Sequence, residues 1–151
     1  MKRVALLTFV MVLAVAAMVM AQAKPDFSGT WAPDTAKSDQ PSGGRGPGGP
    51  PAPMTVKQTA TELTREMKRG EQTMATTYKL DGTESVNKGP MGEVKSTAKI
   101  DGAKLVIKTV RETPNGTMES TETWSLSADG KELTVVSASP RGERKTVYTK
   151  Q

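Results

Sequence analysis

The chain contains no cysteine and no histidine among its 151 residues. The absence of cysteine excludes disulfides and thiol nucleophiles, and the absence of histidine removes the commonest acid–base catalyst and the usual ligand of zinc, copper and haem. A hydroxyl nucleophile would need a lysine or a carboxylate as its base, and no such cluster stands out in the sequence. We therefore expect no catalytic residues, no metal, no cofactor and no enzymatic activity.

A long apolar run occurs only at the amino terminus. Lys2 and Arg3 precede an apolar stretch, Val4 to Met20, which is interrupted only by Thr8, and Ala21-Gln22-Ala23 follows it. This order is typical of a secretory signal peptide that is cleaved after residue 23. The alternative is an uncleaved anchor helix, because the run is slightly shorter than a membrane span. A lipid-anchored lipoprotein is excluded, since no cysteine follows the run.

Strong charge of either sign is also lacking. Cleavage would remove Lys2 and Arg3 and lower the formal net charge from +5 to +3, spread along residues 24–151. Such a charge indicates ordinary solubility, with no nucleic-acid partner and no membrane association after cleavage. We expect a secreted or periplasmic protein whose single domain, 24–151, is held together by its core alone.

What the chain does contain is a ladder of alternating strands in its last third. Asp-Gly, Asn-Gly or Arg-Gly dipeptides separate runs rich in threonine and valine, and such dipeptides supply the left-handed backbone of tight hairpins. The predicted strands are 104–112, 117–126, 131–139 and 143–150, with turns at 101–102, 115–116, 129–130 and 141–142. The ladder predicts an all-β, antiparallel up-and-down meander closed into a barrel, because closure removes exposed edges. An open two-sheet sandwich is the alternative.

The preceding segment continues the same pattern. Strands are predicted at 54–59, 62–68, 71–80, 83–86 and 94–100, with turns at 69–70 and 81–82 and a longer loop at 88–92. With a first strand at 27–31, the barrel would hold about eight to ten strands. No stretch after residue 23 has an apolar stripe of helical period, so we expect essentially no helix.

A segment rich in proline and glycine, 40–53, interrupts the strands. It holds five of the ten prolines and five of the fourteen glycines, and its only charge is Arg45. Such a composition forms neither strand nor helix, so we predict a flexible loop. The loop is either a partner-binding proline segment or a tolerated surface insertion.

The first predicted strand carries a family resemblance. Phe27-Ser28-Gly29-Thr30-Trp31, followed by Asp34 and Lys37-Ser38, resembles the opening of small exported bacterial lipocalin-like proteins of the calycin type, which have no assigned activity. The resemblance implies that Gly29 and Trp31 close one end of the barrel. It also implies that a basic residue of the last strand covers Trp31; Arg144, Lys145 and Lys150 are the candidates. The alternative role for Trp31 is a ligand contact.

Candidate binding residues lie on the predicted inner faces. On 117–126, alternation places Met118, Ser120, Glu122, Trp124 and Leu126 on one face. A carboxylate inside a barrel needs a cationic or hydrogen-bonding partner, so Glu122 is either a polar ligand anchor or a solvated residue near the rim. Strand alternation places Arg65 on one face with Leu63 and Met67, and this alternation is the basis for naming Arg65 as a candidate partner of Glu122.

The carboxyl terminus resembles the last strand of intracellular fatty-acid-binding proteins, which reads Arg-x-Tyr and holds a lipid carboxylate. Tyr148 matches the tyrosine, but Thr146 occupies the arginine position, and the helical lid of that family is replaced by the Pro/Gly-rich loop. Tyr148 is therefore carried over only as a candidate.

Two functions follow from these observations. In the first, the barrel binds a small apolar or amphipathic ligand, its expected partner, through Tyr78, Met118, Glu122, Trp124 and Tyr148, because many small inward residues leave the barrel underfilled. In the second, a filled barrel acts as an interaction module of the cell envelope through its surface or loop 40–53. An interior cavity of about 300 Å³ or more favours the first.

Overall fold

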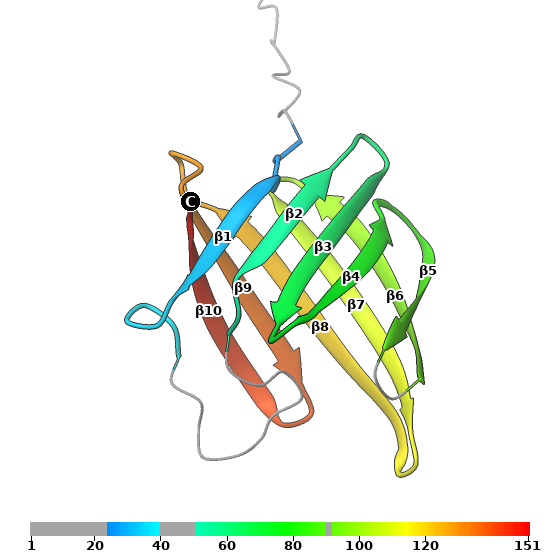
Figure 1. Ribbon diagram of the computed structural model, residues 1–151. Helices are drawn as coiled ribbons and strands as arrows, with labels where there is room; N and C mark the ends of the chain where they lie inside the picture. The colour runs from blue at the N-terminus through cyan, green and yellow to red at the C-terminus, as the bar shows by residue number, and fades with distance from the viewer. Residues whose placement is uncertain (1–23, 40–50, 90–91) are drawn as a thin grey trace, which may run out of the picture.

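Ten β-strands make up the regular structure of the chain (Figure 1). The computed structural model describes residues 24–39, 51–89 and 92–151, so the predicted signal peptide and most of the predicted loop 40–53 lie outside the described residues. The strands are β1 (Gly29–Asp34), β2 (Met54–Gln58), β3 (Glu62–Arg69), β4 (Gln72–Lys79), β5 (Asp81–Gly89), β6 (Gly92–Asp101), β7 (Lys104–Thr113), β8 (Gly116–Leu126), β9 (Glu132–Ser139) and β10 (Gly142–Lys150). The described residues contain no helix, so this part of the chain has no helix that is long and apolar enough to span a membrane.

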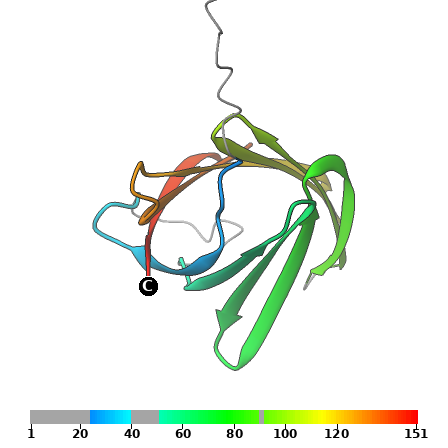
Figure 2. The same ribbon diagram turned by 90° about the horizontal axis from the view of Figure 1, so that it is seen from above.

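All ten strands belong to one antiparallel sheet, with the order β4-β3-β2-β1-β10-β9-β8-β7-β6-β5. Pairing of β1 with β10 joins the first strand to the last, so that the strands curve around a common interior (Figure 2). The fold is the predicted all-β meander in a nearly closed barrel, and the two-sheet sandwich is wrong.

The tight turns of the last third follow the predicted dipeptides. Gly102 and Gly130 have φ angles of +59° and +68°, a left-handed region in which a Cβ clashes with the backbone. Gly102 lies in the turn between β6 and β7 and Gly130 in the turn between β8 and β9, and both pairs of strands run in continuous register. The sequence reading of these hairpins is confirmed.

The predicted turn at Asp81-Gly82 lies where β4 ends and β5 begins, but the two strands do not form the hairpin that a closed meander would place there. β4 and β5 form no backbone ladder; they are instead the two edges of the sheet. Asp81 Oδ1 accepts hydrogen bonds from the backbone N–H and the hydroxyl of Thr83, and the register of β5 against β6 shifts between Asp81 and Glu84. This irregularity sends β5 away from β4, and β5 continues to Gly89, three residues beyond its predicted end.

Side chains replace the missing ladder between β4 and β5. The Asn87 amide accepts a hydrogen bond from the Thr77 N–H through Oδ1 and donates one to the Thr77 carbonyl through Nδ2, both at 2.9 Å. Ser85 Oγ accepts a third bond, from the Lys79 N–H, also at 2.9 Å. We call this line of contacts the β4–β5 seam, and it closes the barrel where the backbone does not.

The core occupies the end of the barrel near the start of β1. Gln58 on β2 clamps the residues before β1, because its Oε1 accepts from the Phe27 N–H and its Nε2 donates to the Pro25 carbonyl. Phe27 thereby lies across the barrel, its ring edge-on to Trp124 at 5.9 Å between centroids. Both rings are fully buried, together with residues of β2, β3, β7 and β9.

Candidate functional site

Trp31 on β1 is the residue that the resemblance predicts to act as a plug at one end of the barrel. Its indole is fully buried, and Nε1 donates a hydrogen bond to the Phe27 carbonyl at 3.0 Å. Of the three basic candidates, Lys150 is the one that covers it, with Nζ 5.4 Å from the ring centroid. Gly29 leaves room for this lysine, because a Cβ there would meet Lys150 Cε at 2.7 Å. The closing role of Gly29 and Trp31 stays a prediction, as does the alternative of a ligand contact through Trp31.

Beyond Trp31, a polar cluster spans the interior between β3 and β8. Arg65 Nη1 donates to Glu122 Oε2 at 2.8 Å, and Arg65 Nη2 donates to the Tyr78 hydroxyl at 2.8 Å. Trp124 Nε1 donates to the same Glu122 oxygen at 3.1 Å. The guanidinium also lies over the rings of Tyr78 and Trp124, 5.6 Å from each centroid. We call Arg65, Tyr78, Glu122 and Trp124 the polar cluster.

Strand alternation and register explain why these side chains converge. Leu63, Arg65 and Met67 share the inner face of β3, and Leu63 pairs with Tyr78 on β4. On β8, Glu122 pairs with the buried Ile107 of β7, which fixes its inward direction. β3 and β8 are not neighbours in the sheet, so the contact between Arg65 and Glu122 crosses the barrel.

The interior environment shapes the charges of the cluster. Burial opposes the charge on Arg65, but the Glu122 carboxylate outweighs it and raises the pKa of the guanidinium. Burial raises the pKa of the Tyr78 phenol, although the charge of Arg65 acts in the opposite direction. Burial likewise raises the pKa of Tyr148. The raised pKa values keep the phenols of Tyr78 and Tyr148 neutral at neutral pH.

The ion pair is only partly enclosed. The side chains of Arg65 and Glu122 keep 18% and 25% of their surface exposed, whereas Tyr78 and Trp124 are buried. Arg65 Nε is enclosed and has no hydrogen-bond partner among the described residues. Both hydrogen bonds to Glu122 reach Oε2, and among the described residues none reaches Oε1. Glu122 therefore combines a partly exposed side chain with an acceptor oxygen that no described residue uses.

The other predicted site residues lie on either side of the cluster. Tyr148 on β10 is buried and pairs with Leu133. Met118 is half-buried, four residues along β8 from Glu122, and pairs with Arg111 of β7. The structure therefore brings together Tyr78, Glu122 and Trp124 directly. Tyr148 belongs to the same buried cluster as Tyr78 and Trp124, and the charges of Arg65 and Glu122 act on its phenol. Met118 lies farther along β8.

Sequence reasoning missed two arginines that face the same interior. Arg144 precedes Thr146 and Tyr148 on the inner face of β10, and its charge acts on the Tyr148 phenol. The charge of Arg111 acts on the Tyr78 phenol. Strand alternation in the sequence could have identified both arginines as inward-facing, because Arg111 shares a strand face with the buried Ile107 and Arg144 shares one with the buried Tyr148.

The interior changes character along the barrel axis. The end near Trp31 is apolar, whereas the rows beyond Glu122 carry small hydroxyl side chains. Ser96 is buried and shares a hydrogen bond of 3.1 Å with Thr109, which pairs with Ser120. Among the described residues, no group of acidic side chains is placed to hold a metal ion.

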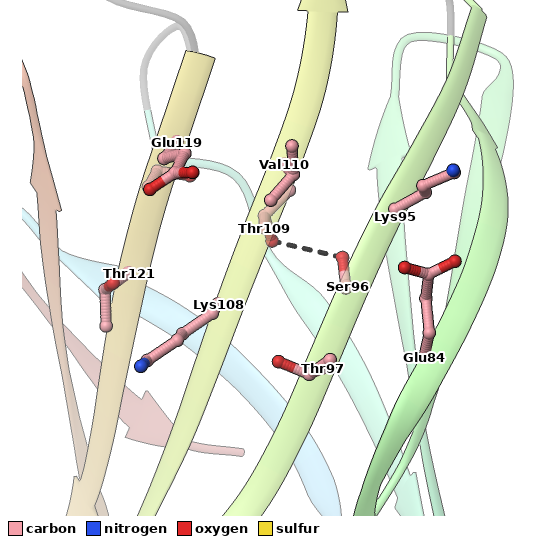
Figure 3. Close-up of a pocket in the computed structure, with 10 residues that line it drawn as sticks. Glu84, Lys95, Ser96, Thr97, Lys108, Thr109, Val110, Glu119 and Thr121 are labelled. Carbon is pink, nitrogen blue, oxygen red and sulfur yellow. Dashed lines mark hydrogen bonds between the residues drawn. The ribbon is translucent and has the colours of Figure 1, made fainter. Parts of the chain in front are cut away.

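A groove of about 200 Å³ lies on the opposite, outer face of β5–β8. Figure 3 shows Glu84, Lys95, Lys108 and Glu119 around it, with the Ser96–Thr109 hydrogen bond behind them. All four charged side chains are exposed, and the two signs balance. This groove is a solvated surface, separate from the polar cluster inside the barrel.

Solved structures with the same fold exist at low sequence identity. The REP1-NXSQ fatty acid transporter matches with a TM-score of 0.60 at 11% identity, over 83% of this chain and 96% of that one. Lipid binding protein 8 of Caenorhabditis elegans matches with a TM-score of 0.61 at 10% identity, over 83% and 95%. Secretory abundant heat soluble protein 4 of Ramazzottius varieornatus matches with a TM-score of 0.60 at 17% identity, over 86% and 97%.

No protein-family model and no curated protein matches the chain. The structural matches establish a shared fold, a calycin-like antiparallel β-barrel, and confirm the barrel that was predicted from the sequence. Similarity to exported bacterial proteins in particular stays a prediction.

Proposed function

We propose that this protein binds a small apolar or amphipathic molecule inside its barrel, without catalysing a reaction. The observation that carries the proposal is the partly exposed ion pair of Arg65 and Glu122 at the boundary between apolar and hydroxyl-lined halves of the interior. Charged side chains are rarely placed inside a small barrel unless they are paired and used, because their desolvation is costly. An amphipathic ligand would place its polar end at this pair.

The fold comparisons support the same function class. Two of the structural neighbours are named as a fatty acid transporter and a lipid binding protein, and both superpose over nearly their whole length. The third bears no ligand in its name, so the fold alone does not decide the matter. The polar cluster is the local feature that favours binding in this chain.

Export completes the proposal. Residues 1–23 carry the charged start, the apolar run and the Ala-x-Ala site of a signal peptide. The mature protein would act in the periplasm or outside the cell, where it would carry its ligand in solution.

Native mass spectrometry of protein purified from its own host tests the proposal. We expect a mass increment that disappears on denaturation, and the released molecule to be apolar or amphipathic. An Arg65→Met variant should lose the increment, whereas Lys57→Met, which removes an exposed cation on β2, should keep it. Protein that carries no ligand, and that binds no long-chain amphiphile when one is added, would contradict the proposal.

The packed end of the barrel favours a second candidate, an interaction module. Leu105, Ile107 and Trp124 are fully buried, so this half of the interior is solid. In that case the protein would act through its surface or through the segment 40–53. A ligand-free crystal structure with no interior cavity of about 300 Å³ would favour the module.

A further inference from the structure

The Arg65 guanidinium is already paired with a carboxylate inside the barrel. Nη1 is bonded to Glu122, Nη2 is bonded to Tyr78, and Nε is enclosed by protein. The charge of the guanidinium is neutralised by a carboxylate that the chain itself supplies. A ligand carboxylate at Arg65 would have to displace Glu122, which would also break the hydrogen bond from Trp124 Nε1.

Glu122 is the member of the polar cluster that remains open. Oε1 has no hydrogen-bond partner among the described residues, and the side chain is 25% exposed. A carboxylate oxygen accepts hydrogen bonds and repels a second carboxylate at short range. The group that best completes this site is a hydrogen-bond donor.

We propose that Glu122 is a specificity-determining residue, which occupies Arg65 in place of a ligand carboxylate and selects amphiphiles whose head group donates a hydrogen bond. Long-chain alcohols and primary amides belong to this class, and free fatty acids do not. The inference rests on the proposed binding function and specifies its ligand class. Arg111 and Arg144 face the same interior. Without the negative charge of Glu122, the positive charges of these arginines would favour a ligand that is a free acid.

Calorimetric titration with three ligands of one chain length tests the inference: dodecan-1-ol, dodecanamide and dodecanoate at pH 8. The wild-type protein should bind the alcohol or the amide at least about tenfold more tightly than the acid, which corresponds to about 1.4 kcal/mol. Glu122→Gln keeps an acceptor for Trp124 and removes the competing charge. This variant should gain affinity for dodecanoate by about tenfold or more and lose the preference.

Glu119→Gln is the matched control. Residue 119 lies on the same strand with the opposite parity, is exposed, and carries the same charge. Its removal changes the net charge equally without touching the interior, so the ligand preference should not change. If a thermal melt shows that Glu122→Gln is not folded, Glu122→Asn provides the same loss of charge. If neither variant folds, the ligand preference of the wild-type protein alone decides whether the inference holds.

The outcomes separate the two proposals. A wild-type protein that prefers dodecanoate, an unchanged preference in Glu122→Gln, or an equal change in Glu119→Gln would overturn the selection by Glu122 and leave ligand binding in place. If none of the three ligands binds to the wild-type protein or to Glu122→Gln, the binding function itself is wrong and the selection fails with it.

Discussion

Replacing Arg65 with methionine should lower the free energy of unfolding by about 2–3 kcal/mol, because it leaves the Glu122 carboxylate inside the barrel without its cation. Removal of one partner from a fully buried pair typically costs about 3–5 kcal/mol, and the exposure of 18% and 25% at these two side chains reduces that figure. Methionine keeps much of the length and apolar contact of the arginine stem.

The double-mutant cycle isolates the ion pair. Glu122→Gln alone should cost about 1–2 kcal/mol, since its amide oxygen still accepts from Trp124 but no longer balances the charge of Arg65. The double variant carries neither charge and should lose only about 2 kcal/mol, which gives a coupling energy of about 2 kcal/mol. Urea unfolding followed by tryptophan fluorescence at pH 7 measures all four proteins.

The exposed pair Lys57–Glu66 provides the control cycle. Its atoms are 2.9 Å apart, close to the 2.8 Å of the interior pair, but its side chains are 68% and 33% exposed. Surface pairs of this kind contribute about 0.5 kcal/mol or less. If the interior cycle is additive within about 0.5 kcal/mol, the reasoning about the polar cluster is refuted.

Three further predictions concern the turns, the phenols and the amino terminus. Gly130→Val should lower the free energy of unfolding by about 1–2 kcal/mol through strain at the positive φ of this residue. Ala128→Val, in the same turn, should change the free energy of unfolding by less than about 0.5 kcal/mol, and equal losses of stability in thermal melts of the two variants would contradict the prediction. Burial raises the pKa of Tyr78 above the value of 10.0 for an ordinary tyrosine, and the associated stability is complete below about pH 10 and is lost as the pH rises through the folded-state pKa. In a urea titration above about pH 10, the unfolding midpoint of Tyr78→Phe should therefore fall less steeply than that of the wild type. Mass spectrometry of protein recovered from the envelope or medium of its host should find Lys24 as the first residue, and an intact Met1 would refute cleavage.

The barrel could be predicted from the sequence because the signals that define its strands and turns are local in the chain. Period-two alternation and the dipeptides at 101–102 and 129–130 fix which residues face inward and where a strand reverses, and both signals act within one hairpin. The positions of Trp124 and Glu122 on one inner face follow from parity alone. The same parity placed Arg65 inside.

Parity made Arg65 a candidate partner for Glu122, and the structure confirms the pair, but parity could not establish that the two side chains meet. The two residues are 57 positions apart on strands that do not neighbour each other in the sheet, so their contact depends on the curvature and closure of the whole barrel. Lys150 was one of three equivalent candidates for the same reason: only the register of β10 against β1 places it beside Trp31. Met118 has the correct parity but lies too far along β8 to meet the polar cluster.

The β4–β5 seam has a consequence for how this protein behaves at high concentration. Each edge strand of an open sheet is a template on which a strand of another copy can pair, and this is how many β-proteins begin to aggregate or exchange segments. Here one amide, from Asn87, imitates a strand by offering both a donor and an acceptor to Thr77. Two polar side chains, Asn87 and Ser85, therefore cover part of the backbone of the edge strand β4, and loss of the Asn87 amide would free the Thr77 N–H and carbonyl for pairing with another copy.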